Sequence, residues 1–185
     1  MSETAAAAGD SAYSGLFGAF PYAFRRSNSQ LFRAYVVVGG LLAGLLGVAF
    51  GLAFVVSVAQ STGLATGGTS SFVRAFVLLV GFLVVLPVLA PVLLVARHHR
   101  RAGGDARYDR ALAAAGVVYL ASLYLFVVAS MPPEFVLDGE SVTRPEPSGL
   151  SAPVVTVLYA IPPIASPVVP LASAALLWSV HRRYR

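Results

Sequence analysis

The chain has 185 residues, of which 57% are hydrophobic and only 11% are charged, whereas soluble domains carry about a quarter charged residues. Its formal net charge is +5, and all 13 basic residues are arginine. The absence of cysteine excludes a disulfide framework, a thiolate metal site and a cysteine nucleophile.

The first 34 residues are predicted to form a cytoplasmic segment with two parts. Residues 1–10 are small and polar, so we expect them to be disordered. From Tyr13 onward, aromatic residues alternate with arginines, a composition typical of a segment in the lipid headgroup layer. An ordinary cytoplasmic flank with anchoring aromatics is the alternative. Four residues approximate one helical face, which Pro21 is expected to disturb: Leu16, Phe17, Phe20 and Phe24.

Two helix starts are marked by capping residues. Ser27 with Gln30 fits a capping box, which predicts that the first long helix begins near Asn28. The glycines at 103–104 predict a turn, after which Asp105 can cap the third long helix.

Four uncharged apolar stretches are each long enough to cross about 30 Å of hydrocarbon as a helix. They contain no Asp, Glu, Lys, Arg or His, and one central charge would cost roughly 2.5–3.5 kcal/mol. We therefore predict an all-α membrane protein with four transmembrane helices in an antiparallel bundle. The predicted spans are residues 35–59, 76–96, 111–131 and 154–180, with an extracytoplasmic loop at 132–153 and a cytoplasmic tail at 181–185.

The arginines predict the orientation, because short loops rich in positive charge stay in the cytoplasm. Eleven of the 13 lie in the N-terminal segment, the second loop and the tail, whereas the first and third loops hold only Arg74 and Arg144. We therefore expect a multi-pass protein of the cell membrane with both termini in the cytoplasm. Since the arginines flank helix ends, we expect contact with anionic lipid headgroups and no binding of nucleic acid.

The first span carries glycines at intervals of four, three and four residues: Gly40, Gly44, Gly47 and Gly51. This spacing places them on one helical face, as a groove that lets another helix approach closely. We expect the chain's own bundle to fill the groove. A homodimer seam, or contact with another membrane protein, is the alternative.

Prolines lie near the centres of the second and fourth spans: Pro87, Pro91, Pro162, Pro163, Pro167 and Pro170. Each removes a backbone hydrogen bond, so we expect both helices to be kinked, and the fourth to be either kinked or broken between Ile161 and Leu171. The freed carbonyls can bind a solute, or nearby hydroxyls can satisfy them: Tyr119, Ser122, Tyr124, Thr156, Tyr159 and Ser166.

The third loop is predicted to contain a short β-hairpin, in which residues 135–137 and 140–143 flank an Asp138-Gly139 turn. Residues 93–101, the end of the second span, are similar to residues 176–183, the end of the fourth. This similarity suggests a 2+2 duplication; two independent arginine-rich ends required by the topology are the alternative.

Few groups can support catalysis. Three histidines lie at the cytoplasmic boundary, where they can meet in space: His98, His99 and His181. A metal site needs further ligands, and helix capping and pairing with Arg110 account for Asp105 and Asp109. We expect no catalytic residue, cofactor or metal, with a lipid-modifying enzyme that uses the histidines as an alternative.

One resemblance rests on composition. All basic residues are arginine, Ala, Val, Gly and Leu are abundant, and the third loop is acidic and rich in proline. In composition the chain resembles small multi-pass membrane proteins of extreme halophilic archaea, a resemblance that implies no site.

We predict a non-enzymatic structural or interaction component of the membrane. The alternative is a small passive channel or permease subunit with a midplane cavity between the second and fourth helices. A continuous polar cavity at the level of Pro87 and Pro167 would support this alternative.

Overall fold

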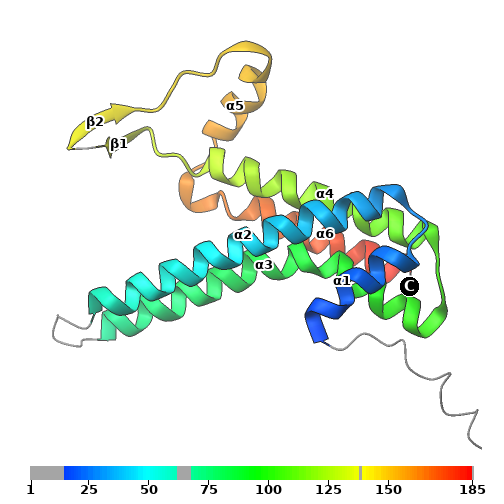
Figure 1. Ribbon diagram of the computed structural model, residues 1–185. Helices are drawn as coiled ribbons and strands as arrows, with labels where there is room; N and C mark the ends of the chain where they lie inside the picture. The colour runs from blue at the N-terminus through cyan, green and yellow to red at the C-terminus, as the bar shows by residue number, and fades with distance from the viewer. Residues whose placement is uncertain (1–14, 62–67, 138, 185) are drawn as a thin grey trace, which may run out of the picture.

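The computed structural model describes residues 15–61, 68–137 and 139–184. The expectations for residues 1–10, for Tyr13 and for Asp138 lie outside these residues. The described elements are α1 (Gly15–Arg26), α2 (Gln30–Ser61), α3 (Gly68–Ala102), α4 (Ala106–Ala129), β1 (Glu134–Leu137), β2 (Glu140–Thr143), η1 (Gly149–Ser151), α5 (Ala152–Tyr159), η2 (Pro163–Ala165) and α6 (Val168–Tyr184) (Figure 1).

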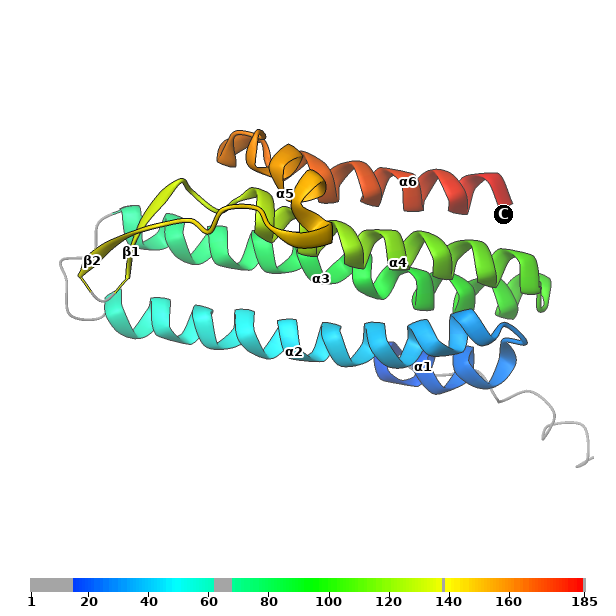
Figure 2. The ribbon, with the colours of Figure 1, turned by 90° about the horizontal axis from the view of Figure 1, so that it is seen from above.

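Four helices in this part of the chain are long and apolar enough to cross a membrane, which confirms the prediction of four helical spans. Successive long helices run in opposite directions (Figure 1). In Figure 2, α3 and α4 lie between α2 on one side and α6 on the other. The buried residues of α4 form its face toward these neighbours, and two of them, Leu112 and Ala113, are fully buried.

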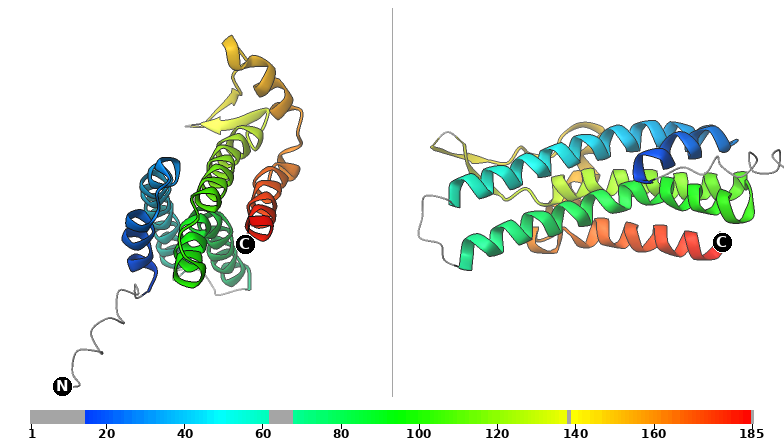
Figure 3. Two further views of the ribbon diagram at one scale, coloured as in Figure 1. Left: turned by 90° about the vertical axis from the view of Figure 1, so that its right-hand side faces the viewer. Right: turned by 60° about the horizontal axis from the view of Figure 1, so that its bottom comes forward.

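The helix α1 continues through Pro21, and the expected disturbance of its face by this proline stays a prediction. Ala19 and Ala23 are fully buried, and Phe20 packs close to Gly40 of α2. In Figures 2 and 3, α1 runs back alongside α2. The two helices therefore form a helical hairpin, and small alanines allow α1 to pack closely.

The fourth predicted span is divided into α5, η2 and α6. The helix α5 ends at Tyr159, and Pro162 has the extended ψ of 136° that precedes the 3-10 turn η2. Prolines 163 and 167 cannot donate a backbone hydrogen bond, so a continuous helix would lose successive ladder bonds here. The run that the sequence presents as one span therefore gives a membrane-length helix only from residue 163 to residue 184.

The helix α3 is unbroken across Pro87 and Pro91. Because Pro87 has no N–H, the carbonyl of Leu83 lacks its usual partner four residues later. The hydroxyl of Tyr119, on α4, lies 3.2 Å from this carbonyl oxygen and 3.2 Å from that of Val84, and it donates to both. A side-chain hydroxyl thus satisfies the backbone at the proline, while the expected kink of α3 stays a prediction.

The predicted hairpin is present, with Phe135 opposite Val142 in an antiparallel pair. Its residues are exposed or only partly buried, and an isolated two-stranded hairpin is marginally stable. The loop is tied back by Arg144, whose guanidinium lies 4.0 Å from the centre of the Tyr159 ring and donates to the carbonyl of Met131.

Tyr35 of α2 joins three helices. Its side chain is almost fully buried, and its hydroxyl donates to the carbonyl of Val88 on α3 at 2.7 Å. The ring fills a notch at Gly116 of α4, where an added Cβ would lie 2.5 Å from two ring carbons. Since moving the ring would break its hydrogen bond, Gly116 has no room for a side chain.

We predict that Gly116→Ala lowers the free energy of unfolding by about 1–3 kcal/mol, because it overpacks a buried contact. The measurement is reversible unfolding in detergent, followed by circular dichroism. The matched control is Gly44→Ala, since a Cβ there meets nothing within 4 Å and alanine favours the helix. Equal stability of the two variants would contradict the proposed packing.

Candidate functional site

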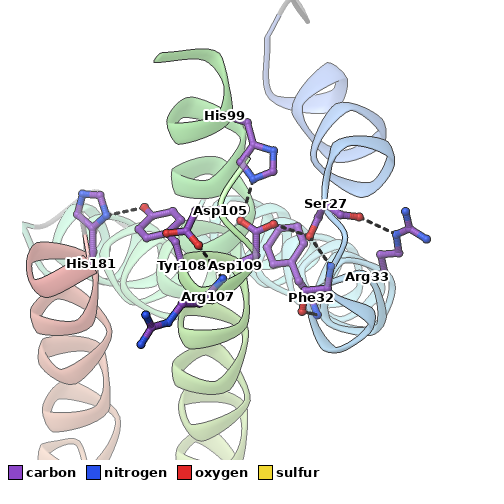
Figure 4. A network of polar contacts seen from close by, with 10 residues as sticks. Ser27, Phe32, Arg33, His99, Asp105, Arg107, Tyr108, Asp109 and His181 are labelled. Carbon is purple, nitrogen blue, oxygen red and sulfur yellow. Dashed lines mark hydrogen bonds and ion pairs between the residues drawn. The ribbon is translucent and has the colours of Figure 1, made fainter. Parts of the chain in front are cut away.

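Three buried or part-buried side-chain contacts between elements lie together at one end of the bundle. There the α1–α2 corner at residues 27–29, the α3–α4 turn at 102–105 and the last turn of α6 come together (Figure 4). We call this the arginine-rich end, because the last turns of α1, α3 and α6 each carry arginines. Under the predicted topology it is the cytoplasmic end.

Asp109 is the centre of this end. Its Oδ2 accepts a hydrogen bond from Ser27 Oγ at 2.5 Å, and its Oδ1 lies 2.9 Å from His99 Nε2. All three side chains are buried, with Asp109 only 1% exposed. One carboxylate therefore links the α1–α2 corner, the end of α3 and the first turn of α4. The expectation that Asp109 pairs with Arg110 was wrong.

The α1–α2 corner is held by its own serines. The N–H of Phe32 donates to Ser29 Oγ, so Ser29 caps α2, which begins at Gln30. The predicted capping box at Ser27 was therefore wrong by two residues. Ser27 Oγ accepts from the N–H of Ser29 while it donates to Asp109, and the Ser27 carbonyl accepts from Arg33 Nε at 3.0 Å.

The α3–α4 turn forms as predicted. Gly103 has a φ of +87°, which favours glycine, and Asp105 caps α4 by accepting from the N–H of Arg107 at 2.8 Å. This start places Tyr108 and Asp109 at consecutive positions in the first turn. Their side chains consequently point to different neighbours, Tyr108 toward α6 and Asp109 toward the α1–α2 corner (Figure 4).

Tyr108 connects the third and fourth spans. It is fully buried, and its hydroxyl is 2.7 Å from Nδ1 of His181 on α6. Its ring centre is 4.2 Å from that of His98 and 6.0 Å from that of His181. His98 and His181 hold the same place in the two similar helix ends, so the suggested duplication would place them on either side of one tyrosine.

This geometry is suited to holding helices together. A nucleophilic serine needs its hydroxyl on a base such as imidazole and open to substrate. Ser27 is fully buried and bonds to a carboxylate. His99 pairs with Asp109, His181 is hydrogen-bonded to Tyr108, and the His98 ring lies against the Tyr108 ring. Among the described residues no group of three or more potential ligands could hold a metal ion.

The predicted glycine face is mostly uncovered by the chain itself. Only Gly40 has a close neighbour, the ring of Phe20; a Cβ on Gly44, Gly47 or Gly51 would meet nothing within 4 Å. The glycines line two adjoining hollows, of about 520 and 230 Å³, between α2 and its neighbours.

The predicted prolines lie in several different environments. Pro167 and Pro170 line a cavity of about 360 Å³ between α3, α4 and α6, whereas Pro91 is fully buried in the helix packing. Pro162 and Pro163 form the η2 turn, and Pro87 lies in α3 beside the Tyr119 hydroxyl. The cavity is lined by apolar side chains and by Tyr119.

Sequence reasoning missed Asp109 as a structural centre. A signal was present, because Asp109 precedes Leu112, Ala113 and Gly116 by three, four and seven residues, the spacing of one helical face. That face is the buried one. A carboxylate in line with it requires a buried partner.

Comparison with known proteins returns one family. The model of a domain of unknown function, DUF8056, matches residues 1–185. Neither the curated proteins nor the solved structures contain a match.

We predict that Asp109→Asn lowers the free energy of unfolding by about 3 kcal/mol, since it weakens two buried charge-assisted contacts. Unfolding in detergent provides the measurement. Asp105→Asn is the control: it makes the same chemical change, and asparagine caps a helix as well as aspartate does, so its effect stays below about 0.5 kcal/mol. A similar loss in both variants would refute the central role of Asp109.

Proposed function

We propose that this chain, which belongs to the DUF8056 family, is a non-enzymatic structural component of the cell membrane that pairs with a second copy of itself through the glycine face of α2. The observation that carries the proposal is the open space at Gly44, Gly47 and Gly51. Glycine on a membrane helix lets two backbones approach closely, and packing drives association in lipid.

The environment of α2 supports pairing. It is the least buried of the four apolar helices, and the arrangement of the chain leaves Leu41, Val48 and Leu52 largely exposed beside the glycines. A two-fold interface uses the same surface on both copies. Two glycine faces are self-complementary, because neither carries side chains that would keep the other helix away.

The chemistry of the arginine-rich end supports a non-enzymatic role. Inside the protein, the Asp109 carboxylate forms its contacts with the side chains of Ser27 and His99. Catalysis requires such groups to reach a substrate. These contacts instead fix the relative positions of the helices, including α2, which carries the glycine face.

The channel alternative has less support. The cavity beside Pro167 would need polar walls to conduct ions or polar solutes, and its lining is apolar apart from Tyr119. The Tyr119 hydroxyl already donates to the carbonyls of Leu83 and Val84. A cavity of this kind favours lipid chains or another apolar occupant.

The proposed orientation has both termini in the cytoplasm, because the arginine-rich end then lies inside. We predict that a membrane-impermeant maleimide labels Ser148→Cys on intact cells but labels Ala102→Cys only after permeabilisation. Both side chains are exposed, and the chain has no other cysteine. The reverse labelling pattern would invert the topology.

We predict that Val48→Cys, beside the glycine face, forms a covalent dimer with a bifunctional maleimide in native membranes. Adding Gly47→Leu should reduce the dimer at least about fivefold, because the new side chain separates the backbones. Ala49→Cys is the matched control: it is also exposed but lies about 100° further around the helix. Equal crosslinking at both positions, or no effect of Gly47→Leu, would exclude this interface.

A further inference from the structure

Two adjoining hollows lie at the arginine-rich end, beside the last turns of α3. One has a volume of about 400 Å³ and the other, between α3 and α6, about 260 Å³. Arg97 and Arg101 line both. The first is also lined by Leu93 and Arg100, and the second by Leu94, His98, Ala102, Trp178 and His181.

The aromatic residues that line the second hollow are held in place by contacts with a buried tyrosine. Fully buried Tyr108 is hydrogen-bonded to His181 and its ring lies against that of His98. The ring of His181 is in turn 5.6 Å from that of Trp178. The aromatic wall is therefore anchored in the helix packing, while Arg97 and Arg101, which also line this hollow, are exposed.

The described residues that line the two hollows include three arginines and no carboxylate. The two acidic residues at the start of α4 have other partners: Asp109 is buried against Ser27 and His99, and Asp105 caps α4. Arg97 and Arg101 are four residues apart and thus neighbours on one face of α3. Two adjacent guanidinium groups are well suited to bind the oxygens of a phosphate.

The position favours a phosphate that is attached to a lipid. Arg97 directly follows the apolar stretch that ends at Ala96, Leu93 and Leu94 of that stretch line the hollows, and Trp178 is 58% exposed. Tryptophan is enriched at the level of the headgroups, and basic pockets between membrane helices bind anionic headgroups. Leucine side chains beside the arginines offer a surface for the first carbons of an acyl chain.

We propose that Arg97 and Arg101 bind the phosphate of an anionic phospholipid in the hollow between α3 and α6, against the wall formed by His98, His181 and Trp178. This site is independent of the proposed pairing through α2. The proposed site binds a single headgroup at a defined place, in contrast to the diffuse attraction that any arginine-rich surface has for a membrane.

The chain reports on this site directly, because Trp178 is its only tryptophan. The full chain in neutral detergent is titrated with phosphatidylglycerol, with phosphatidylcholine and with inorganic phosphate, while tryptophan fluorescence is recorded. Native mass spectrometry counts the bound lipids. We expect saturable binding of one phosphatidylglycerol, at least about tenfold tighter than phosphatidylcholine, and weakened by salt.

The double variant Arg97→Gln/Arg101→Gln should bind phosphatidylglycerol at least about tenfold more weakly. The control Arg107→Gln/Arg110→Gln removes the same charge from exposed positions outside the two hollows and should bind as the unmodified chain does. Saturable binding of inorganic phosphate with the same dependence on Arg97 and Arg101 would reassign the site to a soluble phosphate compound. Equal weakening in both double variants, or equal affinity for the two lipids, would overturn the proposal.

Discussion

One buried carboxylate organises this protein. Asp109 accepts from Ser27 and pairs with His99, so three segments that are distant in the sequence meet on its two oxygens. A charge without partners in such surroundings would be strongly unfavourable. The positions of the α1–α2 corner, the end of α3 and the start of α4 are therefore interdependent. Tyr108, the preceding residue, extends this constraint to α6 through His181.

The rest of the bundle follows a related rule, that backbone groups in lipid need partners inside the protein. Pro87 leaves the Leu83 carbonyl without its usual partner, and Tyr119 supplies a hydroxyl from the next helix. The Tyr35 hydroxyl donates to the carbonyl of Val88 on α3, and its ring fills the notch at Gly116. Tyr119, whose hydroxyl resembled the lining of a solute pathway in the sequence, thus joins α4 to α3, and Tyr35 joins α2 to α3.

Features that depend on neighbouring residues could be predicted from the sequence. Four apolar helices follow from long uncharged stretches, the Asp105 cap follows from its place after two glycines, and the hairpin follows from the Asp-Gly turn. Contacts between distant residues could not be predicted. Ser27 and Asp109 are 82 positions apart, and no local pattern indicates that one carboxylate joins them. The break before α6 could be predicted only in part, because the prolines indicated its place but not whether the helix would bend or stop.

The long helices differ in length. With about 1.5 Å of rise per residue, the 32 residues of α2 and the 35 of α3 extend about 48 and 53 Å, whereas the 17 residues of α6 extend only about 26 Å. All three are joined at the arginine-rich end, so the excess of α2 and α3 projects from the other end (Figure 1). In a bilayer, such a difference between the two flanks is accommodated by tilt of the bundle, by a local change in bilayer thickness, or by polar helix ends that extend past the hydrocarbon. The arginine-bearing last turns of α3 are one such end.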